Sequence, residues 1–136
     1  MGKQMTEMLK GTLEGIVLAI LAGRPAYGYD ITARLREMGF SDIAEGTVYA
    51  LLVRIEQRGF VDVEKHPSEK GPPRKVYSLN AQGRAYLEEF WQTWGFLTAQ
   101  LEQLHEGGNK PWQQDGLRRS PDRSSRRSST GSTKRA

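Results

Sequence analysis

The sequence predicts a mainly α fold with one small β-hairpin, an α+β arrangement that ends in a long helix. Three observations support this fold class. Apolar residues recur at helical spacing over several stretches, whereas residues 60–79 hold two short segments with the alternation of strands. A chain of 136 residues is long enough for one domain with a modest core.

Composition narrows the classes of function. The formal net charge is +4, but residues 107–136 hold eight Lys/Arg against two Asp, so residues 1–106 have a net charge of −2. Any nucleic-acid binding must therefore come from local patches. The chain has no cysteine, and no apolar run reaches the roughly 18 residues of a membrane span, so we expect a soluble, cytoplasmic protein with no membrane partner.

Two helices are expected before residue 40. From Met5 to Ala22, apolar residues recur three and four positions apart, which predicts one amphipathic helix ended by the Gly23–Ala26 breaker. A second helix is expected from Tyr27 to Met38, with Gly39 as its stop. Its predicted buried stripe consists of Ile31, Leu35 and Met38.

The segment from Glu45 to Gly59 is expected to form the organising helix. Its narrow apolar stripe is Val48, Leu51, Leu52 and Ile55, and Gly59 supplies the stop. The opposite face is nearly free of acid and carries small side chains: Gly46, Tyr49, Ala50, Val53 and Gln57, with Thr47 and Arg54 on the flank. Such a helix, taken alone, is more often an ordinary helix that packs on the core than a recognition helix. The tight connection to the helix before it favours a helix-turn-helix.

A hairpin follows this helix. Phe60–His66 alternates apolar and polar residues, Arg74–Leu79 reads as a second strand, and a turn-rich loop joins them. Two helices followed by a hairpin form the winged-helix arrangement, with the hairpin as the wing. Its basic residues are Lys65, His66, Lys70, Arg74 and Lys75; the alternative is an ordinary solvated hairpin.

The last helix is expected to begin after Asn80, a good N-cap. Apolar residues recur along it with the a/d spacing of a coiled coil: Leu87, Phe90, Trp94, Leu97, Leu101 and Leu104. This seam favours a homodimer; the alternative is packing on the first helix of the same chain. We therefore expect a winged helix-turn-helix domain over 1–79, a dimerisation helix over 80–106 and a disordered basic Arg/Ser-rich tail over 107–136.

Catalytic and metal-binding motifs are missing from the sequence. His66 and His105 are the only histidines, and there is no zinc-ligand pair, nucleophile elbow or phosphate-binding glycine loop. We therefore expect no enzyme, no cofactor and no metal.

Duplex DNA is the partner that this arrangement favours. The start of the organising helix offers free N–H groups to a phosphate, and Thr47 and Tyr49 carry hydroxyls for phosphates or base edges. Ala50 and Val53 suit thymine methyl groups, and Arg54 suits a guanine or a phosphate. Lys70, Arg74 and Lys75 would place the wing along a neighbouring backbone.

Several segments together resemble the PadR family of transcriptional regulators: Gly46–Leu52, Arg54–Glu56, Gly59, Gly71, Arg74–Tyr77 and Leu79–Gly83. Tyr27–Asp30 agrees with the start of that family's second helix. With this resemblance, Tyr27 and Gly46 join the expected DNA-binding residues. The single long last helix looks like the short subfamily. Pro72-Pro73 in the wing and the basic tail depart from the family pattern.

The resemblance implies a dimeric repressor that is released by a small, often aromatic effector. Its dimer interface is built by the first and last helices, where Trp94 matches a ligand-lining position; the alternative is that Trp94 is only interface packing. The expected dimer and ligand-pocket residues are Leu13, Ile16, Leu87, Phe90, Trp91, Trp94, Leu97 and Leu101.

We expect the dimer to bind an inverted repeat with half-sites about one helical turn apart. Two other functions remain open: a winged helix that binds protein or RNA, and a DNA-binding protein without an effector.

Overall fold

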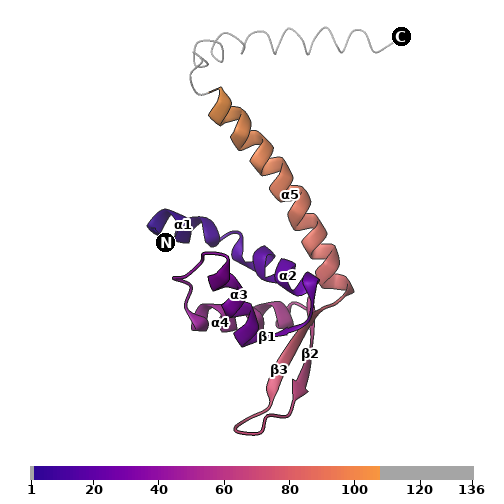
Figure 1. The fold of residues 1–136 in the computed structure, drawn as a ribbon. Helices are drawn as coiled ribbons and strands as arrows, with labels where there is room; N and C mark the ends of the chain where they lie inside the picture. Colours follow the sequence, from indigo (N-terminus) through magenta and orange to yellow (C-terminus); the bar gives the residue numbers. More distant parts are fainter. Residues whose placement is uncertain (1, 108–136) are drawn as a thin grey trace, which may run out of the picture. The chain divides into compact units, whose positions relative to one another are not determined.

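The computed structural model describes residues 2–107, and within that range it contains five helices and one antiparallel sheet. The predicted fold class is confirmed: the chain is mainly α, with a small sheet and a long C-terminal helix (Figure 1). The elements are α1 (Lys3–Leu9), α2 (Leu13–Gly23), β1 (Ala26–Tyr27), α3 (Gly28–Glu37), α4 (Glu45–Gln57), β2 (Val61–His66), β3 (Arg74–Leu79) and α5 (Ala81–Glu106). The basic tail predicted from residue 107 onward lies, apart from Gly107, outside the described residues.

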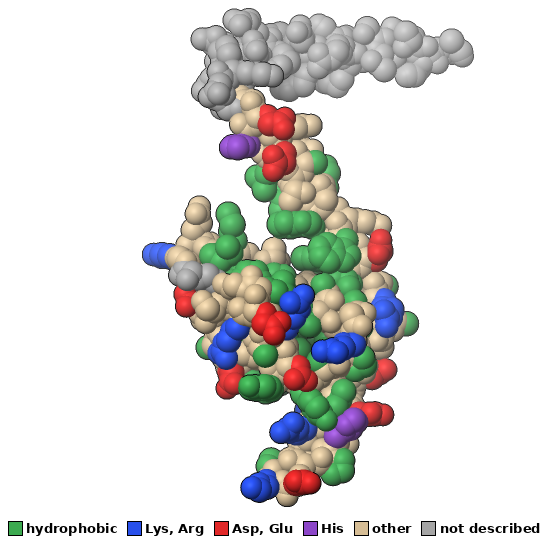
Figure 2. Space-filling view, viewed as in Figure 1, with side chains coloured by type: hydrophobic (Ala, Val, Ile, Leu, Met, Phe, Trp, Pro, Cys, Tyr) green, Lys and Arg blue, Asp and Glu red, His purple; other side chains and the backbone are tan. Residues whose placement is uncertain are grey.

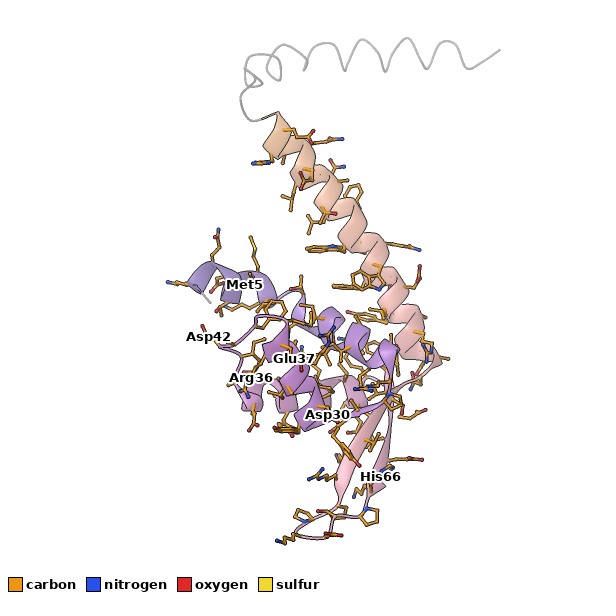
Figure 3. All side chains as sticks on the ribbon, viewed as in Figure 1. Met5, Asp30, Arg36, Glu37, Asp42 and His66 are labelled. Carbon is orange, nitrogen blue, oxygen red and sulfur yellow. The ribbon has the colours of Figure 1, made fainter. Side chains whose placement is uncertain are left out.

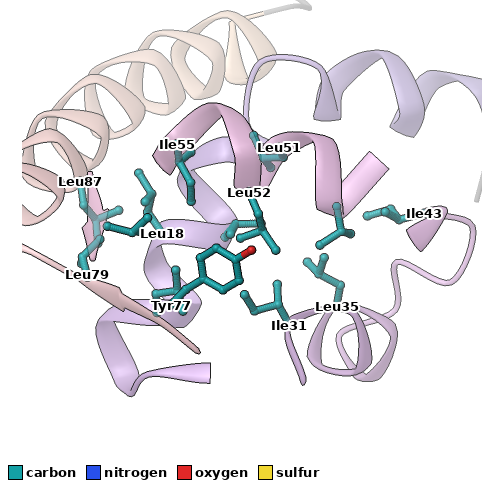
Figure 4. Packing of buried hydrophobic residues seen from close by; sticks show 14 of the residues in the cluster. Leu18, Ile31, Leu35, Ile43, Leu51, Leu52, Ile55, Tyr77, Leu79 and Leu87 are labelled. Atoms are coloured by element: carbon teal, nitrogen blue, oxygen red, sulfur yellow. The ribbon is translucent and has the colours of Figure 1, made fainter. Parts of the chain in front are cut away.

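The core lies between α2, α3, α4 and the sheet. Leu18, Ile31, Leu35, Leu52 and Ile55 are completely buried, and they point toward one another in Figure 4. The stripe predicted for α4 is confirmed, because all four of its members are buried. Burying each such side chain contributes about 1.5–3 kcal/mol, so this cluster fixes which face of α4 remains outside.

The sheet has the strand order β1-β3-β2. β2 and β3 form the predicted hairpin, with Val61 opposite Leu79 and His66 opposite Arg74. Figure 1 shows this hairpin extending away from α2, α3 and α4. The two-residue strand β1 was not expected from the sequence; it pairs with β3 through Ala26–Tyr77 and Tyr27–Val76 and ties the start of α3 to the wing.

The N-terminal helical region is two helices, and the prediction of one continuous helix from Met5 to Ala22 is wrong. The backbone N–H groups of Lys10, Gly11 and Thr12 each bond to the carbonyl three residues earlier, which is a tightened end of α1. Gly11 is the weakest helix former of this segment, and the break falls at that residue. The apolar spacing continues across the break, so periodicity alone could not reveal it.

Both predicted glycine stops are confirmed. Gly39 and Gly59 follow α3 and α4 with φ of 103° and 81°, the left-handed conformation that suits a residue without Cβ. The expected burial of Met38 is wrong: Met38 is the C-cap of α3 and its side chain is exposed, because the chain turns away at Gly39.

Helix α5 begins as predicted, since Asn80 Oδ1 accepts a hydrogen bond of 2.9 Å from the N–H of Gly83. The chain up to Thr93 forms one compact unit, and the rest of α5 belongs to a second unit. In that second unit, Trp94, Leu97 and Leu101 leave large parts of their side chains exposed.

Candidate nucleic-acid interface

Helix α4 carries most of the residues that the sequence predicts for DNA binding, and its outer face includes Tyr49 and Val53. Tyr49 and Val53 are 43% and 49% exposed, although they alternate with fully buried residues of the same helix. Gly46 has open space where a Cβ would stand. The face is therefore free to approach another surface closely.

The start of α4 is not closed by a side chain. Its N-cap is Ala44, which makes no side-chain cap, and the Ala44 carbonyl accepts from the N–H groups of Thr47 and Val48. Positive partial charge at an uncapped helix start attracts anions, although Glu45 in the first turn opposes it.

A cavity of about 600 Å³ lies between α4, the start of α3 and β3. It brings together residues that are up to 48 positions apart in sequence but were all predicted for DNA binding: Tyr27, Tyr49, Val53, Arg74 and Lys75. Gly28, Tyr29, Pro73 and Tyr77 complete the lining. The cavity combines aromatic rings with two cations, which is a chemistry suited to a phosphate backbone and base edges.

Tyr49 is positioned by Gly28. A Cβ added to Gly28 would lie 2.5 Å from Tyr49 Cε1 and 3.0 Å from its hydroxyl oxygen, so the ring can pack on α3 only because residue 28 is glycine. Beside it, Tyr77 is almost fully buried, and burial, followed by the charge of Glu56, raises the pKa of its phenol. Tyr77 therefore lines this cavity as an uncharged phenol at ordinary pH.

The cations of the wing are held by neighbouring groups. The Arg74 guanidinium lies 5.3 Å from the centre of the Tyr27 ring, and the His66 ring meets the same tyrosine edge-on at 6.1 Å. Lys75 Nζ lies 3.5 Å from Glu56 Oε1. Figure 2 shows Lys and Arg side chains along the hairpin with Asp and Glu among them, so the wing is a mixed rather than a uniformly basic surface.

Lys70 lies in the loop at the wing tip, away from the residues that line this cavity. Its carbonyl accepts a hydrogen bond of 2.7 Å from Ser68 Oγ, and Gly71 follows with φ of 84°. This turn and Pro72-Pro73 restrict the backbone of the tip.

The remaining predicted residues of α4 lie on its other flank. Gly46, Thr47, Ala50 and Arg54 line a separate concave surface of about 420 Å³ beside α1 and α2. Arg54 Nε is 3.9 Å from Glu14 Oε2, and Glu14 also accepts from Arg58 and Tyr86. The role of Glu14 could not be predicted from the sequence, because its partners Arg58 and Tyr86 are 44 and 72 residues away and follow no local pattern.

The residues predicted for the dimer and ligand pocket fall into two sets. Leu87 is buried in the hydrophobic core of the chain, and Leu13, Ile16 and Phe90 pack partly buried against that core. The exposed members are Trp91 in the first unit and Trp94, Leu97 and Leu101 in the second.

Residues 2–107 contain no group of three or more His, Cys, Asp or Glu side chains arranged to hold a metal ion. None of the helices in this range combines the length and apolar character that a membrane crossing requires. The labelled polar residues in Figure 3 include Asp30, whose carboxylate accepts from the N–H of Tyr27 and caps α3, which is a structural role.

A helix-turn-helix with an exposed second helix and an adjoining hairpin defines a winged-helix DNA-binding protein. Residues 17–89 match the Transcriptional regulator PadR-like family, and the chain belongs to that family. The suspected resemblance is thus confirmed. Members of this family are transcriptional regulators, in agreement with the expectation that the chain is not an enzyme.

Solved structures of similar proteins support the same assignment. A PadR-like transcriptional regulator from Bacillus cereus is 37% identical, with a TM-score of 0.66 over 74% of this chain and 98% of that one. A Streptococcus transcriptional regulator is 39% identical, with a TM-score of 0.65 over 72% and 96% of the two chains. A PadR family regulator from Eggerthella lenta is 32% identical, with a TM-score of 0.69 over 76% and 89%.

Proposed function

We propose that the protein is a homodimeric repressor that binds an inverted repeat in duplex DNA and is released by a small aromatic effector. The observation that carries the proposal is the cavity where Tyr49 and Val53 of α4 meet Tyr27, Arg74 and Lys75. A helix that enters the major groove needs an exposed face of low bulk, and a wing needs cations beside that face.

The contacts divide between positioning and reading. Arg74 and Lys75 on β3, with Lys70 at the wing tip, would hold phosphates, which gives affinity without sequence preference. Tyr49, Ala50 and Val53 would meet base edges and thymine methyl groups, and Arg54 and Thr47 would act on the α2 side of the same helix. Lys75 must leave Glu56 to reach a phosphate, so its contribution is smaller than that of Arg74.

Dimerisation is proposed from the C-terminal part of α5. Trp94, Leu97 and Leu101 are between 42% and 53% exposed and follow the spacing of a coiled-coil seam. Large apolar side chains in a continuous exposed row are typical of an interface, and a second copy of the chain offers the matching row. A planar aromatic effector would stack on Trp94, whose ring is available in the single protomer.

Selection of bound fragments from random duplex DNA tests this function. The proposal predicts recovery of an inverted repeat, and it predicts that Arg54→Ala and Tyr49→Phe weaken binding to the recovered duplex while the dimer persists. Arg84→Ala is the matched control, because Arg84 is an exposed arginine of α5 that lines neither concave surface. Recovery of no palindrome would favour a winged helix that binds protein or RNA.

A further inference from the structure

Glu14 of α2 joins three elements of the first compact unit. Its side chain is only 16% exposed. Glu14 Oε2 accepts from Arg58 Nη1 at 2.7 Å, beyond the end of α4, and Oε1 accepts from the Tyr86 hydroxyl of α5 at 3.2 Å. Arg54 Nε of α4 is 3.9 Å from Oε2. One carboxylate thus serves two arginines and one tyrosine.

Arg58 and Arg54, the two cations near Glu14, differ in how strongly their side chains are restrained. The Arg58 guanidinium lies 4.8 Å from the centre of the Phe60 ring and 5.1 Å from that of Tyr86, and those rings stack at 4.5 Å. Arg58 is therefore fixed by rings as well as by the carboxylate. Arg54 is 59% exposed, and its distance from Glu14 is at the outer limit of an ion pair, so Arg54 is held more weakly than Arg58.

We propose that Glu14 is a positioning residue that draws Arg54 toward α2 and so limits its availability to DNA, to a degree set by the Tyr86 hydroxyl on α5. The inference rests on the proposed function, since it requires that Arg54 meets DNA. Oε2 is shared between two cations, whereas Oε1 has the neutral Tyr86 donor. Loss of that donor leaves more carboxylate charge to attract Arg54, and loss of the carboxylate charge releases it.

This arrangement gives α5 a physical route to the DNA-binding helix. Tyr86 precedes the exposed seam on the same helix, and a shift of α5 that lengthens the Tyr86–Glu14 bond changes the charge that Arg54 experiences. By linkage, DNA that removes Arg54 from Glu14 must strengthen the Tyr86–Glu14 bond in return.

The test measures the affinity of the full chain for a fluorescein-labelled random-sequence duplex by anisotropy over a range of salt. Glu14→Gln should bind about two- to fivefold more tightly at low salt, the range of an exposed ion pair. A more complete phosphate contact by Arg54 should also steepen the slope of log affinity against log salt, by up to about 0.9. Glu89→Gln, which removes the same charge from an exposed position of α5, controls for net charge.

Tyr86→Phe provides a second test without a change of charge. It keeps the ring that stacks on Phe60 but removes the hydroxyl, and we expect DNA binding to weaken about twofold or more. Both effects should vanish when Arg54 is replaced by alanine. Thermal melts of each variant show whether the fold persists.

The results distinguish a failure of the restraint by Glu14 from a failure of the proposed DNA contact by Arg54. If Arg54→Ala leaves DNA binding unchanged, Arg54 is not a contact and the proposed function loses that residue. If Arg54→Ala weakens binding but Glu14→Gln matches Glu89→Gln, the restraint by Glu14 is refuted. Retention of more than half of the Glu14→Gln gain in the Arg54→Ala background would refute it equally.

Discussion

Replacement of Gly28 by alanine should displace Tyr49 from its place beside α3. The added Cβ would lie 2.5 Å from Cε1, 2.9 Å from Cζ and 3.0 Å from the hydroxyl oxygen, whereas ordinary contacts are about 3.4 Å or longer. The ring must therefore move by about 1 Å. Because Tyr49 is 43% exposed, it can swing outward, and the cavity then loses one wall.

Two opposing effects set the change in unfolding free energy that Gly28→Ala causes. Overpacking of this kind costs about 1–3 kcal/mol, and alanine recovers up to about 1 kcal/mol relative to glycine in a helix. The net loss is then between about 0 and 3 kcal/mol, and each kcal/mol lowers the Tm by about 4–8 °C for a domain of this size. Affinity for DNA should fall more than stability alone explains, because the Tyr49 hydroxyl is moved from its position.

A double-mutant cycle measures this coupling. In Tyr49→Leu the atoms that a Cβ at residue 28 would meet are absent, so Gly28→Ala should cost nothing in that background or become slightly stabilising. Urea unfolding of the four proteins gives the interaction free energy. Equal costs of Gly28→Ala in both backgrounds would refute the packing argument, since the clash with the ring is its whole basis.

Three further predictions concern the sheet, the wing and α5. Burial raises the pKa of the Tyr77 phenol above its usual value of 10.0, so the stability that the neutral phenol contributes is complete below pH 10 and is lost as the pH rises through the folded pKa. Tyr77→Phe should therefore remove part of the loss of unfolding free energy between pH 9 and pH 11, measured by urea unfolding at each pH. An unchanged dependence on pH would contradict this cause. Arg74→Ala should reduce the salt slope of DNA binding by about 0.9 and weaken all duplexes alike, whereas a loss confined to one sequence would assign Arg74 to base reading. Leu101→Arg should convert the proposed dimer to monomers in sedimentation equilibrium while the circular dichroism of the fold persists, and a variant that still dimerises would exclude the seam as the interface.

The spacing of apolar residues and the capping residues in the sequence predicted those features of the fold that depend on neighbouring residues. The buried stripe of α4 and the Asn80 cap are confirmed because each depends on residues within a few positions of one another, and the hairpin is confirmed because each of its strands has a local alternation and the two follow one another in sequence. The break at Gly11 was missed since the apolar spacing of α2 continues the phase of α1. The strand β1 has two residues, too few for any alternation to be seen.

The candidate site was predictable in outline and not in detail. Residue chemistry was sufficient to propose Tyr49, Arg74 and Lys75, and the structure places all three around one cavity. It was not sufficient to find the dependence of Tyr49 on Gly28 or the hold of Glu14 on Arg54. Both are contacts between helices, and their partners are separated by chain segments that carry no sign of the pairing.

The central claim is that α4 and the wing together bind duplex DNA. Its most direct test is anisotropy on the duplex recovered by fragment selection, with the full chain, Arg54→Ala, Arg74→Ala and the Arg84→Ala control at two salt concentrations. We predict an inverted repeat with half-sites about 10 base pairs apart, weaker binding by Arg54→Ala and Arg74→Ala, and unchanged binding by Arg84→Ala. Binding that none of these variants weakens, or selection that yields no repeat, would contradict it.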